Sequence, residues 1–190
     1  MNKEMLTYFK ENGFQELEII SENNIFFRNL YFLYFKANKF KEMRSFVGDP
    51  ESSQQEFYVY FDSILVQFRA MILDRVLDKG KKQYIYTERY SFQNYLIRNN
   101  KEVQFKQLEK FLDSQFLEKI EKKGDTEEIF TIRKAIKRIT DKYICHFEKD
   151  TENYYIEDHL VNPYSEFYIL KIINIVLEIC GFPQIELKND

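Results

Sequence analysis

The chain has 190 residues, the size of one ordinary domain, and its 28 basic and 31 acidic residues give a formal charge of −3. This balance argues against a protein that coats nucleic acid through bulk positive charge, although it leaves room for a local basic groove. Hydrophobic residues make up 44% of the chain, too many for a disordered protein, and five glycines and three prolines are too few for the turns of a many-stranded barrel or sandwich.

Apolar residues recur at intervals of three and four along most of the chain, which predicts helices. The expected helices are a short one that ends near Gly13, followed by about 16–44, 51–78, 91–96, 102–122, 125–147 and 163–181. The run 83–86 is locally β-like, and we interpret it as part of a connector. The sequence shows no internal repeat or linker, so we expect one all-α domain over residues 1–190, a bundle of six to seven helices.

The cysteine content and the termini indicate the compartment. The two cysteines, Cys145 and Cys180, make neither a disulfide framework nor a pair with metal-ligand spacing. The first ten residues lack the apolar core of a signal peptide, and the most apolar stretch, 167–180, is too short and too charged to span a bilayer. We therefore expect a cytoplasmic protein with no membrane partner.

The chain contains two histidines, His146 and His159, and lacks the motifs of metalloproteases, P-loop enzymes, dinucleotide-binding proteins and serine hydrolases. His159 follows two carboxylates, but adjacent residues in a loop rarely converge on one metal ion. We therefore expect no metal and no other cofactor.

Residues 131–142 form the most informative segment, because they hold five cations and one anion, a local charge of 5 − 1 = +4 in an acidic protein. On a helix, side chains four residues apart drift by only ~40°, so one face becomes a basic ridge that ends in an imidazole. The ridge consists of Lys134, Arg138, Lys142 and His146. The apolar stripe of the same helix consists of Ile129, Ile132, Ile136, Ile139 and Tyr143.

A histidine beside cations can act as an acid or base near neutral pH, while the cations hold phosphate oxygens. This combination suits metal-independent RNA cleavage, in which the ribose 2′-hydroxyl is deprotonated and the phosphorane charge is stabilised. The alternative that the spacing leaves open is a solvated lysine-rich face with a structural histidine.

This segment resembles the signature of the HEPN superfamily, small helical domains found in many prokaryotic toxins and abortive-infection ribonucleases. That signature places an arginine, an adjacent polar residue and a histidine four to six residues further on along one helix. Residues 140–146 read Thr-Asp-Lys-Tyr-Ile-Cys-His. A second patch, the long helix over 57–78 and the turn at 90–96, is similar to the abortive-infection (AbiU-like) branch of that family. The resemblance covers about residues 20–180.

The chain departs from the family at one position, because Thr140 stands where the family has its arginine. Asp141 takes the polar position and His146 the catalytic one. Arg138 is turned ~160° around a helix from Thr140, so it is a poor substitute. Lys142 lies one turn before His146 and offers a point charge without the bidentate geometry of a guanidinium.

The resemblance implies a HEPN-like fold and a metal-independent endoribonuclease of prokaryotic defence or toxin–antitoxin type. In that interpretation His146 is the general acid/base and Asp141 orients its neighbours. Lys142, Arg138 and Lys134 contact the RNA. The resemblance also implies a homodimer with its signature helices together, and an antitoxin protein as a further partner.

Two other functions remain open. The first is a non-catalytic, degenerate HEPN dimer that binds RNA, a nucleotide or a protein partner, which the substitution at Thr140 favours. The second is a helical assembly subunit without a nucleic-acid role, which the net acidic charge favours.

Overall fold

The computed structural model describes residues 7, 10–11, 25–42, 53–73, 75–86, 90–123, 126–141 and 168–185. Within these ranges the chain is mostly helical, as expected, but it also forms two antiparallel β-hairpins that an all-α fold would lack. The helices are α3 (Ile25–Glu42), α4 (Ser53–Met71), α5 (Phe92–Arg98), α6 (Glu102–Leu112), α7 (Ile132–Arg138) and α9 (Tyr168–Cys180). The hairpins are β1 (Arg75–Asp78) with β2 (Gln83–Tyr86), and β3 (Gln115–Lys123) with β4 (Thr126–Thr131).

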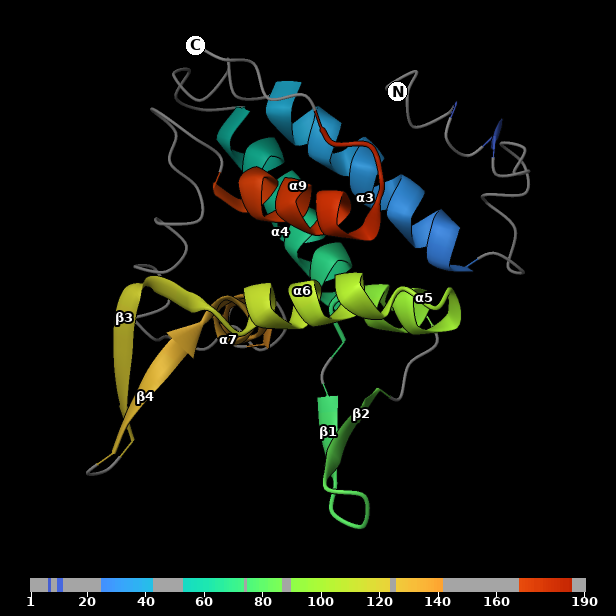
Figure 1. Ribbon diagram of the computed structural model, residues 1–190. Helices are drawn as coiled ribbons and strands as arrows, with labels where there is room; N and C mark the ends of the chain where they lie inside the picture. The colour runs from blue at the N-terminus through green and yellow to red at the C-terminus, as the bar shows by residue number, and fades with distance from the viewer. Residues whose placement is uncertain are drawn as a thin grey trace.

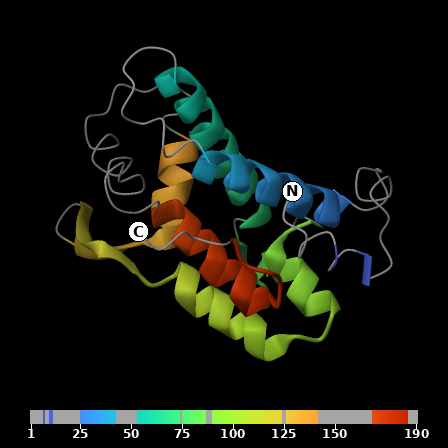
Figure 2. The ribbon, with the colours of Figure 1, turned by 90° about the horizontal axis from the view of Figure 1, so that it is seen from above.

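The helices form a body from which both hairpins project. Helix α3 packs along α4, α6 packs against α5 and α9, and α7 contacts α4 and α6. Figure 1 shows α3, α4 and α9 on one side of α5 and α6, and both hairpins projecting from the opposite side. In the view from above, α9 lies between α3 and α6 (Figure 2). The two hairpins therefore extend from one common side of the helical body.

The core follows the apolar spacing that the sequence shows. In α4, Phe61, Ile64, Leu65 and Phe68 are completely buried, as expected for the inward face of an amphipathic helix. The buried side of α9 is even broader, which fits a helix covered on several sides. Among the described residues, no helix is both long and apolar enough to cross a membrane.

Several predicted helix ends are confirmed. Ser91 caps α5, because its Oγ accepts a hydrogen bond of 3.1 Å from the backbone N–H of Asn94. Helix α9 ends at Gly181, whose φ of +78° lies in the left-handed region that glycine adopts without a steric penalty. The predictions around Gly13, 43–50 and 163–167 lie outside the described residues.

The predicted helix over 102–122 is wrong beyond Leu112, and the predicted helix over 125–147 is wrong before Ile132. Residues 115–123 and 126–131 are the two strands of a hairpin, with Ile120 paired to Ile129 and Lys123 paired to Thr126. Ile129, expected on the apolar stripe of a helix, lies instead on β4 with 56% of its side chain exposed.

The predicted helix over 51–78 is likewise too long, because α4 ends at Met71 and the chain turns into β1. The β-like run at 83–86 is confirmed as an extended segment, and it pairs with β1 in the register Val76 with Ile85 and Asp78 with Gln83. Gly80 therefore lies in a hairpin loop and does not end a helix.

Candidate functional site

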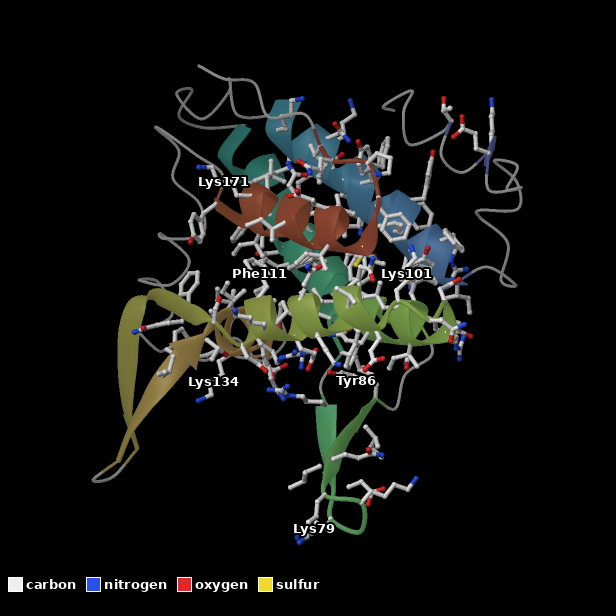
Figure 3. The ribbon with its side chains drawn as sticks, viewed as in Figure 1. Lys79, Tyr86, Lys101, Phe111, Lys134 and Lys171 are labelled. Carbon is white, nitrogen blue, oxygen red and sulfur yellow. The ribbon has the colours of Figure 1, made fainter. Side chains whose placement is uncertain are left out.

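Helix α7 carries the part of the predicted basic ridge that the structure describes. Thr131 caps its N-terminus, because its Oγ1 accepts a hydrogen bond of 3.2 Å from the backbone N–H of Lys134. Ile132 and Ile136 are buried, which confirms the apolar stripe within the helix. Lys134 and Arg138 lie one turn apart, away from these isoleucines, and Figure 3 shows Lys134 on the side from which the hairpins project.

The chain continues beyond α7 as a π-helical turn over residues 139–141. A π turn inserts residues relative to α-helical spacing and so changes the direction in which later side chains point. The prediction that Lys142 and His146 extend the ridge assumes an α-helix throughout. Both residues lie outside the described part of the chain, as does Cys145, so their placement on the ridge stays a prediction.

Thr140, which stands at the arginine position when the segment is matched to the HEPN signature, is 1% exposed. Its Oγ1 donates its proton to one of two backbone carbonyls within reach, that of Ile136 at 2.9 Å or that of Lys137 at 3.0 Å. The side chain is therefore directed into the core and is satisfied by its own helix. A cation placed here would be buried and could not reach a phosphate at the surface without moving the helix.

Asp141, which the resemblance assigns an orienting role, pairs with a different helix. Its Oδ1 accepts from Arg69 of α4 at 2.8 Å, and both side chains are about one-third exposed. This ion pair joins the π turn to α4.

A second cluster of charges joins β1, α6, α7 and the connection between α4 and β1. The guanidinium of Arg133 donates to Glu109 at 2.8 Å, to Asp113 at 3.1 Å and to the carbonyl of Leu73 at 3.2 Å. Arg75 of β1 donates to Glu109 at 2.8 Å and to Asp113. We call these four charged residues, Arg75, Glu109, Asp113 and Arg133, the charge cluster.

The charge cluster changes the electrostatics that the sequence suggests. Arg133 is one of the five cations of the +4 segment, yet it is only 11% exposed and its charge is balanced by carboxylates of α6. The cationic surface of α7 therefore depends on Lys134, Lys137 and Arg138. The sequence does not predict this cluster, since its partners lie far apart along the chain and only the fold brings them together.

The groups around the cluster have perturbed acidities. Burial alone would lower the pKa of the Arg75 guanidinium, but Asp113 and Glu109 outweigh it and raise that pKa above its usual value. Burial, followed by the neighbouring Glu109, raises the pKa of the Tyr86 phenol far above its ordinary value. These effects keep the Arg75 guanidinium charged and the Tyr86 phenol neutral at physiological pH.

Lys101 has a clear structural role at the other end of α6. Its Nζ lies 3.5 Å from the carbonyl oxygen of Cys180 and 5.2 Å from the centroid of the Tyr95 ring (Figure 3 labels Lys101). A hollow of about 560 Å³ opens beside it, between the start of α6 and the end of α9. A cation at the C-terminus of a helix is stabilised by the free carbonyls and the helix dipole, so this lysine serves to cap α9.

The β1–β2 hairpin holds residues that the sequence interpretation misses. The run Lys79-Gly80-Lys81, expected at the end of a helix, lies at the exposed tip of this hairpin (Figure 3 labels Lys79). The signal that could have revealed it is an aspartate two residues before a glycine, followed by the β-like run 83–86. Asp78 Oδ1 accepts from the backbone N–H groups of Gly80 at 2.9 Å and Lys81 at 3.2 Å, which closes a typical Asx turn.

Within the described ranges, no three His, Cys, Asp or Glu side chains gather as they would around a metal ion. Comparison of the chain with protein-family models, with curated proteins and with solved structures gives no match. The chain's own residues and their geometry are therefore the basis for any functional proposal.

Proposed function

We propose that the protein is a HEPN-like endoribonuclease of prokaryotic defence or toxin–antitoxin type that cleaves RNA without a metal ion. His146 acts as the general acid/base, first accepting the proton of a ribose 2′-hydroxyl and later protonating the leaving 5′-oxygen. Lys142 and the α7 cations Lys134 and Arg138 hold the phosphate and stabilise its developing charge. Two copies of the chain bring their signature helices together in a homodimer.

The observation that carries this proposal is the division of α7 into an apolar side and a cationic side. Its isoleucines are buried, while Lys134 and Lys137 remain at the surface just before the segment that contains His146. The pairing of Arg69 with Asp141 supports it, because a fixed exit from the π turn is what a positioned catalytic histidine requires.

The burial of Thr140 favours a second candidate, a non-catalytic relative that binds RNA, a nucleotide or a protein partner as a dimer. The side chain at the family's arginine position is directed into the core and bonds to its own helix, so it offers nothing to a phosphate. If the lysines do not replace the lost arginine, binding remains while cleavage is lost.

The test is cleavage of a mixed RNA pool in the presence of EDTA by the wild-type chain, His146→Ala, Lys142→Ala and Lys110→Ala. Lys110 is an exposed lysine of α6 and serves as the matched control. We expect the wild type and the control to leave 2′,3′-cyclic phosphate ends, and His146→Ala to lose at least about a hundredfold in rate. Wild-type cleavage that persists in His146→Ala, or that disappears with EDTA, contradicts the proposal. RNA binding without cleavage supports the second candidate.

A further inference from the structure

The β1–β2 hairpin extends away from the helical body and carries positive charge at its tip. Its loop, residues 79–82, holds three exposed lysines, Lys79, Lys81 and Lys82, which we call the loop lysines. Within the part of the chain that the structure describes, none of them forms an ion pair with a carboxylate. Asp78 is the one anion in the sequence 78–82, so this segment carries a net charge of 3 − 1 = +2.

Position 82 of the loop is occupied by a lysine although its backbone conformation suits glycine or asparagine better. Lys82 has φ of +51°, in the left-handed region that glycine and asparagine tolerate and that a long side chain rarely adopts. The glycine of the loop stands instead at position 80, where an added Cβ would lie 3.3 Å from Asp78 Oδ1. Lys82 thus adds a third cation to the loop at a position that glycine or asparagine would also fill.

The strands behind the tip expose apolar side chains on both faces. Val76 and Ile85 form a cross-strand pair on one face, with 53% and 37% exposed, and Leu77 on the other face is 48% exposed. The hairpin pairs with no third strand in the described part of the chain. Isolated two-stranded ribbons are marginal in water, so this surface is better suited to a partner than to solvent.

The base of the hairpin is held firmly. Arg75, the first residue of β1, is bound to Glu109 and Asp113, which also bind Arg133 of α7. The hairpin and α7 are thus fastened to the same two carboxylates of α6, and Figure 3 shows Lys79 and Lys134 on the same side of that helix. A ligand bound along the hairpin therefore lies at a fixed position relative to α7.

We infer that the β1–β2 hairpin is a binding element for single-stranded RNA, with the loop lysines on the phosphates and the apolar strand residues against the bases. Phosphates attract exposed ammonium groups whatever the sequence. Base faces are accessible to apolar side chains only where strands are unpaired, because a duplex hides them in its stack. This inference rests on the proposed RNA substrate, but it concerns residues that take no part in the proposed chemistry.

Two other partners fit the hairpin less well. A bilayer would have to admit three ammonium groups before it reached Val76 or Leu77, whereas membrane-inserting elements place their apolar residues deepest. A protein partner would have to cover several lysines, a residue type depleted from protein interfaces. The hairpin carries its charges at the tip and its apolar residues behind them. This arrangement suits a nucleic-acid strand better than it suits a bilayer or a protein partner.

The test measures binding of the full-length His146→Ala chain to a fluorescent single-stranded RNA of about 20 nucleotides between 50 and 200 mM salt. The test variant carries Lys79→Gln, Lys81→Gln and Lys82→Asn, the asparagine being chosen to suit the left-handed backbone. The control variant removes the same charge from exposed positions of α5 and α6 through Arg98→Gln, Lys106→Gln and Lys110→Gln. Circular dichroism confirms that both variants fold.

Each lysine–phosphate contact contributes about 0.7 to the slope of log K against log salt for single strands, so losing three lowers the slope by about 2. Over this fourfold salt range, the affinity of the parent His146→Ala chain should fall about 18-fold more than that of the test variant. The control should keep the slope of the parent chain. An unchanged slope in the test variant, or an equal loss in the control, overturns the inference.

A second variant, Val76→Ser with Ile85→Ser, tests the apolar strands. We expect it to weaken binding to single-stranded RNA at least threefold without changing the salt slope or the binding of duplex RNA. Equal losses on single-stranded and duplex RNA overturn the assignment of these residues to bases. Binding to anionic phosphatidylserine vesicles but not to RNA overturns the inference as a whole. A wild-type chain that binds RNA through the loop lysines but does not cleave it contradicts the proposed function and supports the inference, whereas His146-dependent cleavage with an unchanged salt slope in the test variant does the reverse. The two can therefore fail separately.

Discussion

Arg75 and Arg133 share the same two carboxylates, although one begins a hairpin strand and the other lies in the first turn of α7. Each guanidinium donates to both Glu109 and Asp113, which are one helical turn apart on α6. The cluster is mostly shielded from water, with Arg133 and Glu109 only 11% and 15% exposed. It therefore fixes the hairpin and α7 to one helix.

Removal of one charge from this cluster should lower the stability of the fold. Glu109→Gln leaves two partly buried guanidinium groups with a single carboxylate, and we expect the free energy of unfolding to fall by about 2–4 kcal/mol. Urea denaturation measures the loss. Glu102→Gln is the matched control, because Glu102 pairs with Lys106 on the exposed surface of the same helix, and its loss should leave the free energy of unfolding nearly unchanged. Equal losses in the two variants would show that the cluster adds no stability.

An arginine placed at position 140, where the HEPN signature has one, should not increase RNA cleavage. Thr140→Arg puts a cation and a long side chain into a site that is 1% exposed, so we expect a loss of about 3 kcal/mol or more in the free energy of unfolding. Thermal unfolding of Thr140→Arg and of the control Thr140→Ser, which keeps the hydroxyl, gives the comparison. A stable Thr140→Arg chain with increased RNA cleavage would mean that position 140 reaches the substrate after all.

The ion pair between Arg69 and Asp141 should matter more for activity than for stability. Because both side chains are about one-third exposed, a double-mutant cycle with Arg69→Met and Asp141→Asn should give a coupling of about 0.2–1 kcal/mol in unfolding. If the pair positions the residues that follow, each single variant should lower RNA cleavage by about tenfold, and the double variant should lose little more. Additive losses in cleavage would show that the two residues act separately.

Cys180 provides a pH-dependent prediction. Burial raises the pKa of its thiol to about 12, and the nearby Lys101 only partly opposes this effect. Below pH 8 the thiol is protonated in both the folded and the unfolded state and contributes nothing to the pH dependence. At higher pH the unfolded thiol ionises near the ordinary pKa of a cysteine, about 8.5, while the folded thiol does not. The unfolded state then binds fewer protons, so stability falls as the pH rises towards 12.

The burial of this thiol can be measured in the variant Cys145→Ser, in which Cys180 is the only thiol of the chain. We expect almost no reaction with a thiol-specific disulfide reagent at pH 8 until urea unfolds the chain. Cys145→Ser/Cys180→Ala should remove part of the stability loss between pH 9 and 11. Rapid labelling of the folded Cys145→Ser chain would contradict burial of this thiol.

Local sequence signals predicted several features correctly. Ser91 caps α5, Gly181 ends α9 and the run 83–86 is extended, because each depends on one or two residues and their own backbone. Ile132 and Ile136 of α7 are both buried, because α-helical spacing places residues four apart on one face. These features depend on short-range chemistry, so the neighbouring residues alone are enough to predict them.

The β3–β4 hairpin shows why other segments were mistaken for helix. Phe116 and Ile120 are four residues apart, and a spacing of four fits one face of a helix and, being even, one face of a strand as well. Pairing with the partner strand, in which Ile129 lies opposite Ile120, decides between helix and strand. The residue pair Gly124-Asp125 between the two runs is a hairpin signal of the kind that the helical interpretation overlooked.

The charges of the candidate site depended on the tertiary structure even more. The sequence placed Arg133 within a segment of charge +4, but its partners lie 20 and 24 residues away, at Asp113 and Glu109. Thr140 stands at the arginine position of the HEPN signature that the segment resembles, yet the fold buries its side chain in the core. Electrostatic partners and burial are set by which elements come together in space, and no spacing along a single helix contains that information.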